Sequence, residues 1–189
     1  IREMTEELDE ALLAQRAAEN DAEALSILYR QTAGNLTAVC HRYIRDVHDM
    51  KDVLQDSYLK IFTQISRFHY RGKGSLKAWM TRIVVNESIT FLRRRERFDC
   101  IEYEPELPDH LTETPFDEQD MEALSPQALQ EMIGQLPTGY RTVLNLYVFE
   151  DKSHQEIAQL LGIKESSSAS QLHRAKQMLA RQINEYRKK

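Results

Sequence analysis

The stretch "SHQEIAQLLGIKESSSASQLHRAK", residues 153–176, decides the fold of the second half of the chain. Ser153 followed three residues later by Glu156 forms a capping box, which marks the start of a helix. Gly162 suits the left-handed residue that often ends a helix. A turn then leads to a longer helix, expected over residues 166–187. This order of short helix, glycine turn and longer helix predicts a helix-turn-helix.

The longer helix has a polar face that suits a DNA groove. Leu172, Ala175, Leu179 and Ile183 follow the helical period and should face the core. The residues expected to face outward are Ser166, Ser167, Ser170, Arg174, Gln177 and Arg181. Serine disfavours a helix, but its short side chain lets the helix approach a phosphate or base edge closely. This stripe is therefore a candidate DNA reader.

Two further helices should complete this domain, which we expect over residues 125–189. Ser125 and Pro126 provide an N-cap and a first-turn proline for a helix over residues 126–136. Pro137 should end it, and the apolar residues after it predict a helix over residues 138–149.

The segment before this domain holds most of the excess negative charge. Residues 99–122, "DCIEYEPELPDHLTETPFDEQDME", contain ten acidic residues and no Lys or Arg. The formal net charge of −5 therefore hides a basic remainder, with 20 of the 30 acidic residues against 25 Lys and Arg. Three prolines and repelling carboxylates predict an extended, flexible acidic linker over residues 99–124. The alternative is an acidic strip that occupies a basic groove of a partner.

The first domain, expected over residues 1–98, should also be helical, with helices over residues 6–32, 34–47 and 49–66. In the third of these, apolar residues recur at spacings of three and four. The helix should therefore present Asp52, Gln55, Asp56 and Leu59 to solvent. A leucine beside carboxylates and an amide is a candidate protein-binding face, although single exposed leucines are ordinary.

The stretch "RFHYRGKGS", residues 67–75, should break the helical order at Gly72 and Gly74. Aromatic rings beside glycines and cations can hold an unstacked base. The alternative is a turn whose aromatic residues belong to the core.

The stretch "WMTRIVVNESITFLRRRER", residues 79–97, predicts a helix with two faces. Met80, Val84 and Phe91 should pack. A second stripe should be exposed, with Trp79 and Thr90 at its border, and its members are Arg82, Asn86, Ile89 and Arg93. An amide, guanidinium groups and an aromatic ring on one surface suit nucleic acid. A core tryptophan with a solvated basic helix end is the alternative.

Other classes of function find little support. Cys40 and Cys100 fit no zinc-ligand spacing or disulfide framework, so we expect no metal and a reducing, cytoplasmic compartment. The six histidines are scattered, and no nucleophile triad or glycine-rich phosphate motif occurs, so we expect no catalytic residues and no cofactor. No apolar run approaches the roughly 18 residues that span a bilayer, so we expect no membrane insertion.

Taken in order, these motifs resemble the extracytoplasmic-function (ECF) group of the sigma-70 family of bacterial sigma factors. "DVLQDSYLKIF" resembles the helix that binds core RNA polymerase, and "WMTRIVVNESITFLRRR" resembles the helix that reads the minus-ten element. "LPTGYRTVLNLYVFEDKSHQEIAQLLGI" and "SQLHRAK" resemble the domain that reads the minus-thirty-five element. The second half is similar to members from the Bacteroidetes.

The resemblance implies an all-α transcription initiation factor with roles for particular residues. Asn86 would contact a base, and the loop "HYRGKGS" would receive a base flipped out of the melted strand. The implied minus-ten residues are Tyr70, Arg71, Lys73, Trp79, Arg82, Asn86, Thr90, Arg93 and Arg94. The implied minus-thirty-five residues are Ser166, Ser167, Ser170, Gln171, His173, Arg174 and Gln177. Asp52, Gln55, Asp56 and Leu59 would bind polymerase.

The implied partners are core RNA polymerase, promoter DNA and an anti-sigma factor, often membrane-anchored in this group. The acidic linker would enter a basic channel of the polymerase. "ESSSASQ" departs from the family, where many members carry Gly-Thr near Ser166 and basic residues near Ala169 and Gln171. Fewer cations mean fewer phosphate contacts, so the minus-thirty-five preference stays open. The rival hypothesis is a helix-turn-helix regulator that binds duplex DNA without polymerase.

Overall fold

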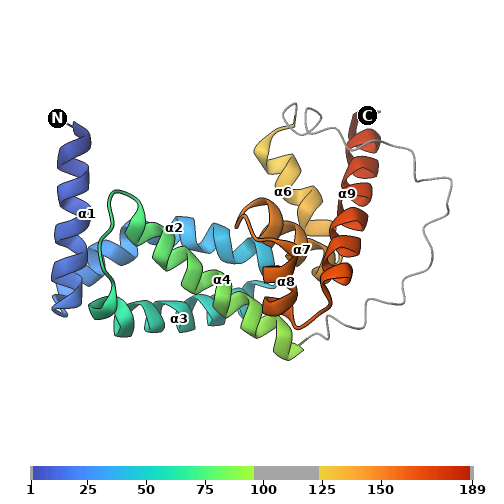
Figure 1. Ribbon diagram of the computed structural model, residues 1–189. Coiled ribbons are helices and arrows are strands. Elements are labelled where there is room, and N and C mark those ends of the chain that lie inside the picture. The colour runs from blue at the N-terminus through green and yellow to red at the C-terminus, as the bar shows by residue number, and fades with distance from the viewer. Residues whose placement is uncertain (1, 96–123, 188–189) are drawn as a thin grey trace. The chain divides into compact units, whose positions relative to one another are not determined.

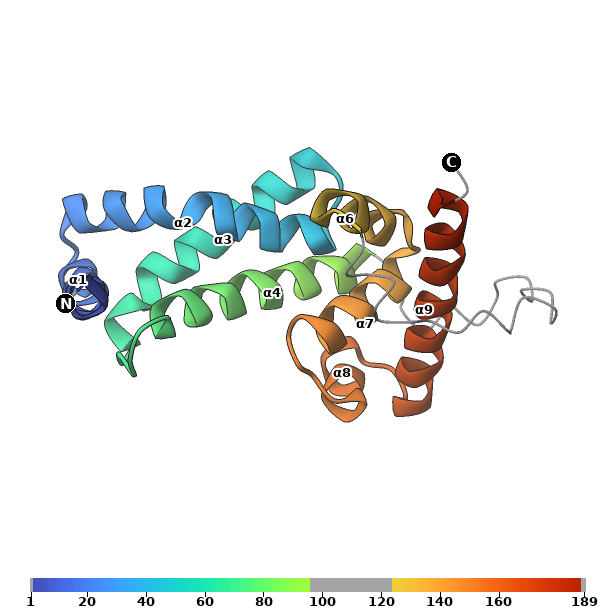
Figure 2. The same ribbon diagram turned by 90° about the horizontal axis from the view of Figure 1, so that it is seen from above.

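The computed structural model describes residues 2–95 and 124–187, with side chains from residue 10 onward. The described residues form helices and no strand, in two compact units, Ile1–Leu92 and Arg93–Lys189 (Figures 1 and 2). The expected class, two small helical domains with the second a helix-turn-helix, is confirmed. The acidic segment 99–122 lies outside the described residues.

The first unit begins with two helices that meet at a sharp corner. Helix α1 spans Arg2–Ala18 and helix α2 spans Ala22–Tyr43. Asn20 at the corner has a left-handed φ of 60°, and Asp21 caps α2 by accepting from the backbone N–H groups of Glu23 and Ala24. Arg16 holds the corner with ion pairs to Asp21 at 2.6 Å and Glu23 at 3.0 Å.

The observed helix boundaries differ from two expected helices. The predicted helix over residues 6–32 is broken at residues 19–21, and α2 runs on through residue 34. Val47, placed at the end of the predicted helix 34–47, instead begins α3, because the Asp46 carboxylate accepts from the N–H groups of His48 and Asp49.

Helices α3 and α4 complete a three-helix bundle with α2. Helix α3 spans Val47–Gln64, the 3₁₀ turn η1 spans Ile65–Arg67, and α4 spans Ser75–Arg95. Figures 1 and 2 show α2 and α4 running in one direction with α3 opposed to both. Helix α1 lies across the end of the bundle where α4 begins (Figures 1 and 2).

Small polar side chains let the bundle helices approach closely. Ser57 of α3 and Ser88 of α4 are fully buried, and each donates its hydroxyl to a carbonyl of the preceding turn. Cys40 of α2 is a buried free thiol whose Sγ lies 3.7 Å from the Ser88 Oγ. Burial raises the pKa of the Cys40 thiol. The core therefore holds this cysteine in its neutral form.

The second unit begins with two helices close to their expected positions. Helix α6 spans Pro126–Gln135, and the Ser125 hydroxyl accepts from the N–H of Ala128 at 3.2 Å. Helix α7 spans Thr138–Val148, and its residues from Gly139 to Leu146 are all buried. The Arg141 guanidinium is buried as well and donates to the Leu136 carbonyl at 2.8 Å.

Helices α8 and α9 form the predicted helix-turn-helix. Helix α8 spans His154–Leu161, and both hydrogen bonds of the capping box between Ser153 and Glu156 are present. Gly162 ends α8 with a φ of 71°, as the left-handed cap requires. Helix α9 spans Glu165–Arg187 and packs against both α7 and α8.

Candidate nucleic-acid and polymerase surfaces

A polar stripe runs along the exposed side of α4. Its members are exposed, and they are Arg82, Asn86, Thr90, Arg93 and Arg94. The first four are three or four residues apart, and Arg94 directly follows Arg93. The Thr90 hydroxyl donates to the backbone carbonyl of Asn86 at 2.8 Å, so it is already engaged in the helix. The Asn86 amide is exposed, with its donors and acceptor available to a ligand. We call these five residues the α4 stripe.

One sequence expectation for this helix needs correction. Ile89 is 3% exposed and belongs to the core, not to the stripe, because α4 is buried over a wide arc in the bundle. Phe91, expected to pack, is partly buried. Trp79 is also half-buried, and its ring lies 5.3 Å from the Phe68 ring. The tryptophan therefore packs on one side and leaves part of its surface open.

The loop before α4 presents cations around two glycines with positive φ. Gly72 and Gly74 have φ values of 114° and 85°, which only glycine adopts readily. Arg71 and Lys73 are exposed, while Tyr70 is half-buried. The backbone N–H of Arg71 donates to the Ser75 hydroxyl at 3.2 Å, which closes the loop onto the first turn of α4. The structure thus brings these three expected minus-ten residues to the start of the helix that carries the α4 stripe.

A residue that the sequence did not single out also meets this loop. The Glu10 carboxylate of α1 accepts from the backbone N–H groups of Gly74 at 2.7 Å and Leu76 at 3.0 Å. No local pattern could have found this contact, because 64 residues separate Glu10 from Gly74.

The expected polymerase-binding residues share one outward face of α3. Asp52, Gln55, Asp56 and Leu59 are all exposed, and Leu59 is 63% exposed. The opposite face of the helix is buried through Met50, Val53, Ser57, Tyr58 and Ile61. The α3 face, as we call these four exposed residues, therefore combines two carboxylates, an amide and an apolar side chain on a rigid helix.

An ion pair joins the helix of the α3 face to the helix of the α4 stripe. The Lys60 Nζ lies 2.5 Å from a Glu87 carboxylate oxygen, and the Glu87 side chain is only 16% exposed. Sequence analysis missed this pair, because each residue lies on the flank of its own helix. The pair links the two helices that carry the two surfaces.

The expected DNA-reading stripe of α9 is present with one exception. Ser166, Ser170 and His173 are exposed, and Ser167, Arg174 and Gln177 are half-buried at the edge of the stripe. Gln171 is only 6% exposed, which leaves little of its side chain at the surface, and its contact with DNA stays a prediction. It lies on the same face as the buried Leu172, and its Oε1 has no hydrogen-bond partner among the residues that the structure describes.

A contact between three helices sets the geometry of the helix-turn-helix. The His154 Nδ1 of α8 lies 3.0 Å from the hydroxyl oxygen of Ser168, which is buried in α9. The same His154 ring also contacts α7, where the Tyr147 ring stacks on it with centroids 5.0 Å apart. This contact positions α9, and with it the candidate reading stripe, relative to α8.

Residues 2–95 and 124–187 contain no group of three or more His, Cys, Asp or Glu that could hold a metal ion. Within the same ranges, none of the helices has the length and apolar character needed to cross a membrane.

In a comparison with known proteins, the two units match two regions of one protein family. Residues 28–98 match Sigma-70 region 2, and residues 126–179 match Sigma-70, region 4. The chain is 26% identical over 188 residues to the ECF RNA polymerase sigma-E factor of Haemophilus influenzae, covering 95% of this chain and 98% of that protein. It is 26% identical over 168 residues to the RNA polymerase sigma factor YlaC of Bacillus subtilis, covering 87% and 95%.

A solved structure described as "Structure of CnrH in complex with the cytosolic domain of CnrY" is also similar, with 21% identity and a TM-score of 0.48 over 92% of this chain and 96% of that chain.

The two matched regions together span more than half of the chain, in the order region 2 and then region 4. The chain belongs to the sigma-70 family, in its extracytoplasmic-function group. It is a sigma factor that directs RNA polymerase to promoters, and a regulator that acts without polymerase is not favoured. The narrower expectation of a Bacteroidetes type stays a prediction.

Proposed function

We propose that the first unit of this sigma factor reads the melted minus-ten strand with the α4 stripe and the loop before it. The observation that carries the proposal is the exposed Asn86 amide between exposed arginines, on a helix whose other side is fixed in the core. Arginine binds phosphate through a fork of donors, and an amide pairs with a base edge. Bases unpaired from the duplex can also stack on the open part of Trp79. The loop residues Tyr70, Arg71 and Lys73 receive a flipped base.

The α3 face is the proposed contact with core RNA polymerase. Leu59 supplies apolar area of the kind that protein interfaces bury, and the acidic residues beside it supply charge complementarity. The face lies on a different helix from the α4 stripe. Polymerase and the melted strand can therefore be held by different helices of one rigid bundle.

The second unit is the proposed reader of the minus-thirty-five element. Helix α9 enters the major groove with its N-terminal half, as the second helix of a helix-turn-helix does. Ser166, Ser170 and His173 lie exposed on that half, and Arg174 follows at its edge. Ser167 and Gln177 lie beside them, partly buried. The proposed domain bounds are residues 1–98 and 125–189, with residues 99–124 as the linker.

Family membership supports three narrower proposals. The protein has no catalytic activity of its own and works by binding. It acts in the cytoplasm, where bacterial polymerase and promoter DNA are found. An anti-sigma factor holds it inactive until a stimulus arrives, and that partner is membrane-anchored.

The experiment that tests the proposed function is run-off transcription with the full chain, core RNA polymerase and fragments of genomic DNA. The expected result is a defined set of transcripts that requires both the chain and core polymerase. Sequences upstream of the mapped start sites should then share a minus-ten and a minus-thirty-five element. A chain that binds duplex DNA tightly but supports no transcript with core polymerase contradicts the proposal.

The polymerase contact has its own test with a matched control. Replacing Gln55 and Asp56 together with alanine should weaken co-purification with core polymerase and leave the helical circular dichroism unchanged. Gln64→Ala is the control, because Gln64 is an exposed residue of the same helix about a third of a turn away from the α3 face. Equal co-purification of the double variant and the control shows that the face is not the contact.

A further inference from the structure

Helix α4 begins without a capping side chain of its own. The residue before Ser75 is Gly74, which has no side chain to accept from the first-turn N–H groups. Four backbone N–H groups at the start of a helix lack intrahelical partners, and a Ser, Thr, Asp or Asn normally satisfies one or two of them. The start of the proposed minus-ten reading helix therefore depends on groups from elsewhere in the fold.

Glu10 supplies the missing cap from α1. One carboxylate oxygen accepts from the N–H of Gly74 at 2.7 Å and the other accepts from the N–H of Leu76 at 3.0 Å. The two bonds join the last residue of the loop to the first turn of the helix. A carboxylate is also the favourable charge at this end of the helix dipole. Glu10 thus fixes the direction in which the loop enters α4.

The backbone of the loop is flexible enough that a contact from outside the loop is needed to fix its conformation. Gly72 and Gly74 have φ values of 114° and 85°, and a Cβ built on either glycine meets no atom within 4 Å. Open space around two conformationally permissive residues allows other loop geometries. Arg71 and Lys73, which are proposed to hold a flipped base, lie on either side of Gly72.

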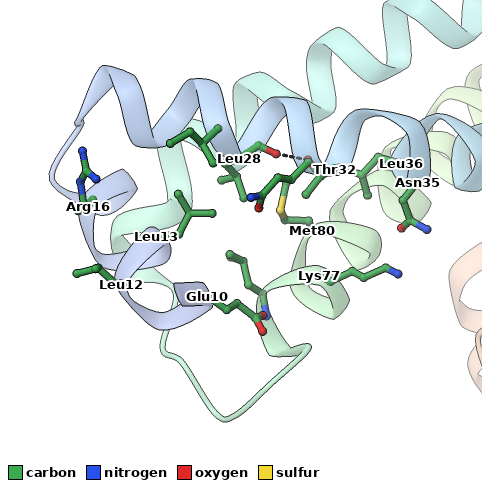
Figure 3. Close-up of a pocket in the computed structure, with 13 residues that line it drawn as sticks. Glu10, Leu12, Leu13, Arg16, Leu28, Thr32, Asn35, Leu36, Lys77 and Met80 are labelled. Carbon is green, nitrogen blue, oxygen red and sulfur yellow. Dashed lines mark hydrogen bonds between the residues drawn. The ribbon is translucent and has the colours of Figure 1, made fainter. Parts of the chain in front are cut away.

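A groove lies beside this contact, between α1 and the bundle. It has a volume of about 600 Å³ and lies between α1, α2 and α4, with Glu10 and Lys77 at its rim and Leu28 and Met80 among its apolar lining (Figure 3). Where side chains do not fill the space between helices, fewer van der Waals contacts fix their positions. The directional hydrogen bonds of Glu10 therefore weigh more in placing the loop.

We propose that Glu10 is a positioning residue for promoter recognition, which sets the loop of residues 68–74 against α4 and so determines the base preference at the promoter position that the loop receives. The inference rests on the proposed minus-ten function of this unit. Glu10 itself touches backbone and not DNA. Its effect is therefore confined to the position read by the loop, and the base read by Asn86 is unaffected.

The test measures binding of the reconstituted holoenzyme to single-stranded minus-ten DNA in which each base is replaced in turn. Loop-read positions are those whose preference changes in Arg71→Ala but not in Asn86→Ala. Glu10→Ala should lower the preference at those positions severalfold, because the loop loses both hydrogen bonds that hold it against the first turn of α4. Glu10→Gln keeps the shape and one acceptor oxygen, so it should fall between the wild type and Glu10→Ala. Glu19→Ala, which removes an exposed carboxylate near the end of α1, is the control and should match the wild type.

The outcomes separate the inference from the function on which it rests. If the wild type shows no base preference at any position, the proposed minus-ten function fails. If the wild type shows a preference and both Glu10 variants keep it at the loop-read positions, only the role of Glu10 is refuted. A uniform loss at every position together with a lower melting temperature in both Glu10 variants would show a merely structural residue and overturn the inference.

Discussion

The Asn86→Ala variant gives the sharpest test of how α4 is used. Asn86 is exposed, and its side chain leaves no buried partner behind when it is removed. The hydrogen bond that Thr90 donates goes to the backbone carbonyl of Asn86, so the substitution keeps it. An exposed helical substitution of this kind changes stability by no more than about 0.5 kcal/mol. The higher helix propensity of alanine favours a small increase.

The expected effect on DNA is much larger. An amide that pairs with a base edge through two hydrogen bonds contributes about 1 to 3 kcal/mol of discrimination against the wrong base. The preference for a matched over a scrambled single strand should therefore fall by about fivefold or more in the variant. Fluorescence anisotropy of labelled non-template strands measures this ratio, and thermal unfolding measures stability in the same samples.

Ile89→Val is the matched control three residues further along α4. Ile89 is 3% exposed, so loss of one buried methylene should cost about 0.5 to 1.5 kcal/mol of stability and leave strand preference unchanged. Asn86→Ala should thus lose strand preference and keep its stability, whereas Ile89→Val should lose stability and keep its strand preference. Two results would refute the reasoning. One is equal affinity of the wild type for matched and scrambled strands, and the other is a large drop in melting temperature for Asn86→Ala without loss of preference.

Arg174→Ala should weaken binding to minus-thirty-five duplex by about 1 to 3 kcal/mol in a gel-shift titration if the guanidinium reads a base, whereas an equal loss on every sequence would make it a phosphate contact. Gln171→Met should leave that affinity unchanged and keep or raise the melting temperature, because Gln171 is buried and its carbonyl oxygen has no partner among the described residues. Ser153→Ala should destabilise the second unit by about 0.5 to 2 kcal/mol in urea unfolding through loss of the capping box. The backbone N–H of Ser153 and the Lys152 ammonium lower the pKa of Glu156 from 4.5, so its contribution to stability is present above that pH and is lost as the pH falls through the lower folded value. Urea midpoints measured from pH 6 down to pH 3 should therefore decline less in Glu156→Gln than in the wild type, and parallel curves would contradict the assignment.

The features that sequence predicted well are those set by neighbouring residues. The capping box and the Gly162 cap depend on a few adjacent positions, and both are present. The outward face of α3 followed from a helical period alone, because one side of that helix packs and the other does not.

The features that sequence missed depend on contacts between distant segments. Ile89 lies on the core side because two neighbouring helices cover α4 over an arc wider than one stripe. Gln171 is buried by the helices that pack on α9, which the period of α9 itself does not report. The break at Asn20 was missed because Asp21, which caps the next helix, resembles an ordinary surface residue in sequence. Glu10 reaches its partners across 64 residues.

The arrangement of α4 has a consequence for how promoter preference can change over evolutionary time. Positions 82, 86 and 90 are exposed, and the buried positions 84, 85, 88, 89 and 92 alternate with them along the same helix. If the α4 stripe reads DNA as proposed, single substitutions at these exposed positions can therefore alter what is read without repacking the bundle. A combinatorial library limited to positions 82, 86 and 90 should yield mostly folded proteins, and selection on altered promoters could recover sigma factors that no longer compete for the original sites.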